Sequence, residues 1–244
     1  MPKEINSWFT SWFNTPYYHI LYQERDHREA AAFMNKLTAH VGLPKGAKIL
    51  DLACGRGRHS KYLYRKGFDV TGVDISKQSI DYAKEYERER LHFEVHDMRE
   101  NYPHTFDAVF NLFTSFGYFE DEQDNLKVIK TIKNSLASQG TGVIDFMNAP
   151  KSIENLVPEE RQSLNGLDFH IRRYLDDDFI VKEINFTDKG EDFQFVERVR
   201  ALTYEDFLGY FAKAEVHLKD VFGDYNLNPY EEKSSERLIL LFGK

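Results

Sequence analysis

The chain has a single cysteine and no long hydrophobic run, and each shortage excludes a class of protein. Cys54 has no partner for a disulfide within the chain, so a disulfide-rich secreted scaffold is excluded. No stretch approaches the roughly 18 to 20 apolar residues that a membrane-spanning helix needs. The aromatic N-terminus is broken by charged and polar residues, unlike a secretory signal. We therefore expect a cytoplasmic protein that has no membrane partner.

Positive charge is also scarce. The 244 residues include 32 Lys and Arg against 40 Asp and Glu, a net charge of −8, and no run of basic residues stands out. A nucleic-acid partner requires a basic stripe that neutralises phosphates, so we expect none. No group of His, Cys and acidic residues has the spacing of a metal site, so we expect no metal.

The most informative stretch is residues 48–60, KILDLACGRGRHS. An apolar run ends in a glycine-rich turn, and a helix begins directly after it. Gly55 and Gly57 can adopt positive φ and let the backbone approach a ligand. The helix behind them offers free N–H groups and the positive end of its dipole. This order of strand, turn and helix predicts the first nucleotide-binding unit of a doubly wound sheet.

Two details distinguish between nucleotides. A dinucleotide fingerprint reads G-x-G-x-x-G, but Ser60 occupies the place of the third glycine, and Asp51 lies four positions before the first. Asp74 follows Gly55 by 19 positions, at the end of the next apolar run. An acid about 20 residues after the turn accepts hydrogen bonds from ribose hydroxyls.

The motif Asp51-x-x-Cys54-Gly55-x-Gly57, followed by residues 72–76, GVDIS, resembles motifs I and II of class I S-adenosylmethionine-dependent methyltransferases. The resemblance covers about residues 45–150 and 203–244. It implies S-adenosylmethionine as cofactor and a Rossmann-like α/β fold. In this fold a doubly wound seven-stranded sheet has the order 3-2-1-4-5-7-6 and an antiparallel last strand.

The hydrophobic periodicity along the chain agrees with this fold. We predict strands near 48–54, 69–74, 91–95, 105–113 and 143–147. Helices are predicted between them, at 58–66, 76–90 and 121–137. A last helix at 204–214 and strands near 216–222 and 237–242 complete a single methyltransferase domain, 1–244.

Two parts fall outside this alternation. Residues 1–42 read as aromatic-rich helices, which either cover the edge of the sheet or form a lid over the cofactor. Residues 150–202 read as an antiparallel β insertion, a loop followed by strands near 169–174, 179–186 and 193–200. Such a meander cannot bury both faces alone. It must pack on the core, on the N-terminal helices, or on another subunit to form a homodimer.

The resemblance also implies roles for single residues. Asp97 would accept a hydrogen bond from the adenine amino group, and Met98 would cover the ring. One N-terminal tyrosine would reach the methionine end, with Tyr17 the first candidate and Tyr22 the second. Cys54 reads as a small buried side chain rather than a nucleophile. The predicted cofactor-binding residues are Asp51, Ala53, Cys54, Gly55, Gly57, Asp74, Ile75, Asp97, Met98, Asn111, Leu112 and Tyr22.

The implied reaction is in-line methyl transfer, in which the protein positions the two centres and excludes water. A general base is needed only for a hydroxyl acceptor. The candidate catalytic residues are Tyr17, His59 and Tyr118. His59 is a candidate base, and the two tyrosines are candidate pocket walls near the methyl group, where aromatic faces can stabilise a cation.

The acceptor class follows from the loop after residue 111. Methyltransferases acting on nucleobase or side-chain amide nitrogens usually have an Asn/Asp-Pro-Pro-aromatic tetrad there, which this chain lacks. The stretch TSFGYF at 114–119 instead resembles a bacterial branch related to sugar-amine N-methyltransferases. We therefore predict a small-molecule amine or hydroxyl acceptor. Two alternatives stay open, a non-catalytic adenosyl-binding protein acting through its β insertion and, less favoured, an NAD-type oxidoreductase.

Overall fold

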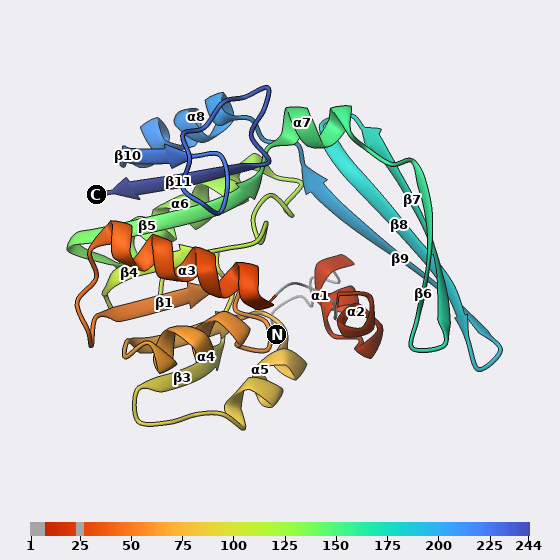
Figure 1. Ribbon diagram of the computed structural model, residues 1–244, viewed down its shortest axis with the longest axis horizontal. Coiled ribbons are helices and arrows are strands. Elements are labelled where there is room, and N and C mark those ends of the chain that lie inside the picture. The colour runs from red at the N-terminus through yellow and green to blue at the C-terminus, as the bar shows by residue number, and fades with distance from the viewer. Residues whose placement is uncertain (1–7, 23–26) are drawn as a thin grey trace.

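The computed structural model describes residues 8–22 and 27–244 (Figure 1). Its core is a seven-stranded sheet made of β1 (Lys48–Leu52), β2 (Asp69–Asp74), β3 (Leu91–Val95), β4 (Phe106–Asn111), β5 (Leu136–Met147), β10 (His217–Phe222) and β11 (Arg237–Gly243). The strand order is β3-β2-β1-β4-β5-β11-β10. Strand β11 runs antiparallel to both of its neighbours, β5 and β10, and the pairings among β1 to β5 are parallel. The predicted order and the antiparallel last strand are confirmed.

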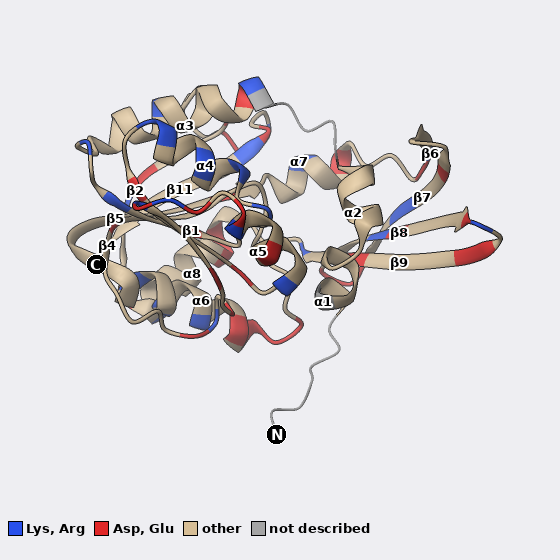
Figure 2. Cartoon of the chain, turned by 90° about the horizontal axis from the view of Figure 1, so that it is seen from below, with Lys and Arg blue, Asp and Glu red and all other residues tan. Residues whose placement is uncertain are grey.

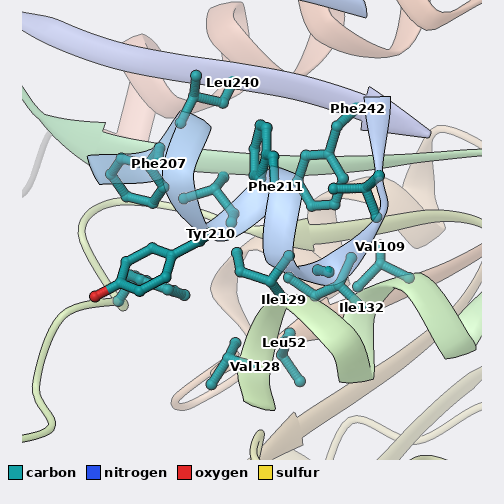
Figure 3. Close-up of a cluster of buried hydrophobic side chains, with 14 of the residues drawn as sticks. Leu52, Val109, Val128, Ile129, Ile132, Phe207, Tyr210, Phe211, Leu240 and Phe242 are labelled. Carbon is teal, nitrogen blue, oxygen red and sulfur yellow. The ribbon is translucent and has the colours of Figure 1, made fainter. Parts of the chain in front are cut away.

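Helices cover both faces of this sheet (Figure 1). One face carries α3 (His27–Val41), α4 (Arg58–Arg65) and α5 (Lys77–Lys84), and the other carries α6 (Glu122–Ser135) and α8 (Tyr204–Ala214). Figure 3 shows the second face, where Phe207 and Phe211 of α8 pack with Phe242 of β11 and with Ile129 and Ile132 of α6. Burial on both faces explains why the central strands are nearly continuous apolar runs.

Polar side chains begin the helices where the sequence predicts them. The Ser76 hydroxyl accepts from the Ser79 N–H, and the Asp121 carboxylate accepts from the Gln123 N–H. These caps satisfy N–H groups that lack a partner within the helix. Two boundaries differ from the prediction. Helix α5 ends at Lys84, and β5 begins at Leu136, directly after α6, because Leu136 already pairs with Phe106 of β4.

A separate antiparallel sheet follows β5 and the short helix α7 (Ala149–Glu154). Its strands, in order, are β6 (Glu159–Leu164), β7 (Leu167–Asp176), β8 (Phe179–Asp188) and β9 (Glu191–Arg200). The sequence predicted three strands, so the loop assigned before them was wrong. The missed strand, β6, reads EERQSL, and its polar residues give no apolar alternation because it lies at an edge of the sheet.

Helices α1 (Trp8–Phe13) and α2 (Pro16–Leu21) lie between the two sheets (Figures 1 and 2). The Trp12 ring lies 4.5 Å from the Phe195 ring of β9, and the Tyr17 ring lies 4.6 Å from the Phe186 ring of β8. The four-stranded sheet therefore buries one face against α1 and α2, one of the three alternatives left open. Asp26 and Glu29 have the spacing of a capping box for α3, but Asp26 lies outside the described residues.

No described helix, within residues 8–22 and 27–244, combines the length and the apolar character needed to cross a membrane.

Candidate functional site

A cavity of about 380 Å³ lies between the carboxyl ends of the central strands and helices α1 and α2. This is where ligands bind in open α/β sheets, and the volume is typical of small-molecule sites. Its floor contains Asp51, Ala53, Cys54, Gly55, Asp74, Ile75, Asp97, Met98 and Leu112, and its other walls contain Phe9, Phe13, Tyr18, His19, Tyr22, His59, Phe113, Ser115, Tyr118 and Phe119. The structure thus brings together most of the residues that the sequence singled out.

The glycine turn has three residues in the left-handed region, Ala53, Gly55 and Gly57, with φ of 65°, 56° and 71°. The two glycines differ in their surroundings. A Cβ on Gly57 would lie 2.4 Å from the Phe93 ring of β3, whereas a Cβ on Gly55 would meet no heavy atom within 4 Å. Gly57 therefore serves the packing of the turn and is not a wall residue, while Gly55 leaves space at the cavity.

Asp74, at the end of β2, holds the turn from the other side. One carboxylate oxygen accepts from the Gly55 N–H at 2.8 Å, and the other accepts from the Ser76 N–H at 2.8 Å. Burial raises the pKa of Asp74, and the two backbone hydrogen bonds oppose that rise. A carboxylate has about four acceptor sites, so Asp74 keeps capacity for the hydroxyl donors of a ligand.

Asp51 is buried under the turn and accepts a hydrogen bond from the Ser60 hydroxyl at 2.5 Å. Burial raises the pKa of Asp51 to about 6, although the Ser60 hydrogen bonds lower it. Ser60 occupies the third-glycine place of the dinucleotide fingerprint, so the departure from that fingerprint is tied to Asp51. Cys54 is buried beside it, and burial raises its thiol pKa well above the usual range, which agrees with an inert small side chain.

Asp97 lines the cavity together with Met98, but its carboxylate is already paired. The Arg99 guanidinium contacts Asp97 at 2.6 Å and Asp124 of α6 at 2.7 Å, and it lies over the Phe119 ring. Burial raises the pKa of Asp97, but the Arg99 hydrogen bonds outweigh it, and the net shift is downward. The sequence analysis did not identify Arg99, because its link to Asp124 appears only once α6 packs beside β4.

His59 and Tyr118 both contact the segment that follows β4. The His59 ring stacks on the Phe113 ring with centroids 4.6 Å apart and planes 15° apart. The Tyr118 hydroxyl donates to the Thr114 carbonyl oxygen at 2.5 Å. Both side chains line the cavity, and their catalytic roles stay predictions.

Two other predicted residues lie away from the cavity lining. The Tyr17 hydroxyl donates to Asp188 in the four-stranded sheet at 2.8 Å, and this hydrogen bond raises the pKa of Tyr17. Successive helical residues point about 100° apart, so Tyr18 lines the cavity in place of Tyr17. Asn111 is fully buried and donates to the Leu52 carbonyl oxygen of β1 at 3.1 Å. Neither placement puts the side chain where its predicted role requires.

Tyr22 does line the cavity, but its hydroxyl belongs to a polar cluster at the four-stranded sheet. The hydroxyl lies 2.7 Å from Glu197 and accepts from the Lys182 ammonium group at 2.7 Å. The Trp12 indole N–H donates to the same Glu197 carboxylate at 2.6 Å. This cluster fixes α1 and α2 as the wall facing the glycine turn.

Comparison with known sequences finds relatives of the first half of the core. Residues 49–140 match the profile of a family described as a methyltransferase domain, which confirms the resemblance drawn from the two motifs. A curated relative, "Putative methyltransferase YqeM" of Bacillus subtilis, is 34% identical over 118 residues, which cover 47% of this chain and 48% of the relative. The chain spans about half the length of the curated relatives it matches.

Comparison with solved structures extends over nearly the whole chain. An S-adenosylmethionine-dependent methyltransferase from Clostridium acetobutylicum superposes with a TM-score of 0.79 at 21% identity, over 93% of this chain and 95% of that one. S-adenosylmethionine-bound CalS10, an amino pentose methyltransferase from Micromonospora echinaspora, gives 0.71 at 20% identity, over 93% and 96%. At these identities the likeness establishes the fold alone.

Proposed function

We propose that the protein transfers the methyl group of S-adenosylmethionine to a small-molecule acceptor that carries an amine or a hydroxyl. The observation that supports this most directly is the cavity itself. It joins the glycine turn and Asp74 on one side to an aromatic wall from α1 and α2 on the other. The methyltransferase domain match at residues 49–140 supports the same chemistry.

The residues present fit this cofactor. The space at Gly55 admits close approach to the backbone, and Asp74 has acceptor capacity for the ribose hydroxyls. Ile75, Met98 and Leu112 offer apolar surface for the adenine ring. Asp97 lines the cavity and would accept from the adenine amino group, while Arg99 holds its carboxylate. When bound, S-adenosylmethionine would supply an electrophilic methyl group.

The chain's own residues would orient the acceptor and exclude water. Phe13, Tyr18 and Tyr118 present aromatic rings to the cavity, and such faces attract a cationic sulfonium or ammonium group. For a hydroxyl acceptor, His59 is our candidate base and Tyr118 a second group near the reacting oxygen. CalS10 is an amino pentose methyltransferase, and this likeness favours an amine over a hydroxyl as the acceptor group.

Calorimetric titration of the purified protein with S-adenosylmethionine, and separately with NAD(H), tests the cofactor. We expect binding of S-adenosylmethionine alone. Asp74→Ala should weaken it by about 10-fold or more, because hydrogen bonds to a charged group contribute about 1.5–3 kcal/mol. Asp69→Ala, at the opposite end of the same strand, is the matched control. Binding of NAD(H) instead, or equal affinity in all three proteins, would contradict the proposal.

Transfer of radiolabelled methyl groups to a panel of amino sugars, small amines and phenols tests the reaction. A protein that binds the cofactor but methylates none of them would favour the alternative, a non-catalytic adenosyl-binding protein. The NAD-type alternative is disfavoured by Ser60 and Asp51, which depart from the dinucleotide fingerprint. A cytoplasmic location, the absence of nucleic-acid and membrane partners, and a homodimer formed through the four-stranded sheet remain parts of this proposal.

A further inference from the structure

The segment that follows β4 contains two consecutive residues in the left-handed region, Phe113 and Thr114, each with φ of 58°. Neither is glycine, and Thr114 is β-branched, so this backbone is unfavourable unless its surroundings hold it. Such strain often occurs where side chains must be aimed at a ligand. We therefore consider which contacts hold Phe113 and Thr114 in this conformation.

A buried ion pair holds both of them. Asp145 of β5 is fully buried, and its side chain lies 2.7 Å from the Arg237 guanidinium of β11. The Asp145 carboxylate accepts from the Phe113 N–H at 2.8 Å, and the Asp145 carbonyl oxygen accepts from the Thr114 N–H at 2.9 Å. Arg237 also donates to the Thr114 hydroxyl at 3.0 Å. Each residue of the dipeptide is thus fixed by at least one partner of the pair.

Phe113 and Thr114 in turn contact the two cavity side chains described above, His59 and Tyr118. Phe113 provides the ring on which His59 stacks, and Thr114 provides the carbonyl oxygen to which the Tyr118 hydroxyl donates. Tyr225, in the connection from β10 to β11, packs on Phe113 with ring centroids 5.3 Å apart and donates to Asp145 at 3.3 Å. The chain of contacts from the ion pair to the cavity is therefore continuous.

We propose that Asp145 and Arg237 are positioning residues, which hold Phe113 and Thr114 in the left-handed conformation and thereby orient His59 and Tyr118 toward the acceptor. The proposal rests on the proposed function for the meaning of that orientation. The orientation itself is a property of the free protein and can be measured without cofactor or acceptor. The pair contributes no atom to the cavity lining among the described residues, so its effect on the chemistry is indirect.

The test replaces both charges together, as Asp145→Leu with Arg237→Met, because a buried pair exchanged for apolar residues leaves no lone buried charge and usually permits folding. The NMR signals of the His59 ring protons report the stacking, since protons above an aromatic face resonate upfield. They are assigned by their loss in His59→Gln. We expect these signals to move downfield in the double variant.

Arg237→Lys gives a graded comparison, because an ammonium group keeps the charge but lacks the planar fork that contacts Asp145 and Thr114 together. It should move the His59 signals part of the way. The matched control is Glu160→Leu with Arg173→Met, which removes a 2.7 Å ion pair of the four-stranded sheet. The control should leave the His59 signals unchanged.

Turnover gives the second readout. For an acceptor that the wild-type protein methylates, kcat of the Asp145/Arg237 double variant should fall by about 10²-fold, as a displacement of about 1 Å can cause. The calorimetric Kd for S-adenosylmethionine should not change. Unchanged His59 signals in the folded double variant would overturn the proposal, and so would an unchanged kcat. Failure of the wild-type protein to bind S-adenosylmethionine would instead refute the proposed function.

Discussion

At the scale of single residues, Gly55 and Gly57 of the turn differ in what surrounds them. Gly57 faces the buried Phe93 ring, which would lie 2.4 Å from an added Cβ, whereas Gly55 faces open space. Both have positive φ, so alanine at either position is strained. The difference between the two substitutions therefore isolates the steric contact.

We predict that Gly57→Ala lowers the free energy of unfolding by about 1–3 kcal/mol more than Gly55→Ala does, because overpacking adds to the shared backbone strain. Urea denaturation of both variants beside the wild-type protein measures this. Equal losses of stability would show that the Phe93 ring moves aside freely.

The sequence motif named both glycines without separating these roles, because Phe93 lies on β3, 36 positions further along the chain. Tyr17 illustrates the same limit. The aromatic spacing indicated that an N-terminal tyrosine faces the cavity, but the rotation of α2 decides between Tyr17 and Tyr18. Asp51, Asp74 and Asp97 line the cavity, because each lies at or just after the carboxyl end of a core strand, and their roles in cofactor binding stay predictions.

At the scale of elements, α1 and α2 depend on one carboxylate of β9. Glu197 accepts from the Trp12 indole N–H and the Tyr22 hydroxyl, and Lys182 lies 3.9 Å away. Little solvent reaches the Glu197 and Lys182 side chains, which are 14% and 15% exposed. Removing the carboxylate would leave buried donors without their acceptor, which is costly.

We predict that Glu197→Ala speeds amide hydrogen exchange in residues 8–22 by about 10-fold or more, since a lost hydrogen bond to a charged group costs about 1.5–3 kcal/mol. Exchange in the seven-stranded sheet should stay as in the wild-type protein. Mass spectrometry of the exchanged peptides measures both regions.

Glu183→Ala is the matched control for that experiment. Glu183 lies on the neighbouring strand, and its carboxylate accepts from the exposed Tyr174 hydroxyl. Its removal should leave residues 8–22 protected. Equal exchange in both variants would mean that ring packing alone holds the two helices.

Elements were predicted well where burial imposes a simple period and poorly where it does not. The central strands and the starts of the capped helices α5, α6 and α8 follow from apolar runs and N-cap residues. Strand β6 was missed because a solvent-facing edge strand needs no apolar alternation. The early start of β5 was missed because its first residues, LASQG, carry no strand signal until β4 pairs with them.

At the scale of the whole molecule, buried acids give stability a pH dependence of mixed sign. Burial raises the pKa of Asp51 to about 6, above the ordinary value of 3.8 that it regains on unfolding. The folded protein therefore binds this proton more tightly than the unfolded chain. Stabilisation from Asp51 is present below about pH 4 and is lost as the pH rises through about 6. Asp97, whose pKa is lowered, acts in the opposite direction.

We predict that the unfolding free energy of the wild-type protein, measured relative to Asp51→Asn, falls by about 1–3 kcal/mol between pH 4 and pH 7. Urea denaturation across that range gives both curves. The asparagine keeps an acceptor for the Ser60 hydroxyl, so the comparison isolates the proton. A difference that is flat, or that rises with pH, would contradict the assignment.

The wall opposite the glycine turn has a consequence for how such proteins can diversify. Trp12 and its partner Glu197 are 185 positions apart, yet they form one contact between α1 and β9. A recombination event that exchanged only the four-stranded sheet would separate these partners and leave α1 and α2 without this contact. The N-terminal helices and the four-stranded sheet should therefore be inherited as a pair, while the seven-stranded core can be kept. A chimera carrying both segments from one parent should keep residues 8–22 protected from amide hydrogen exchange, whereas one carrying either alone should not.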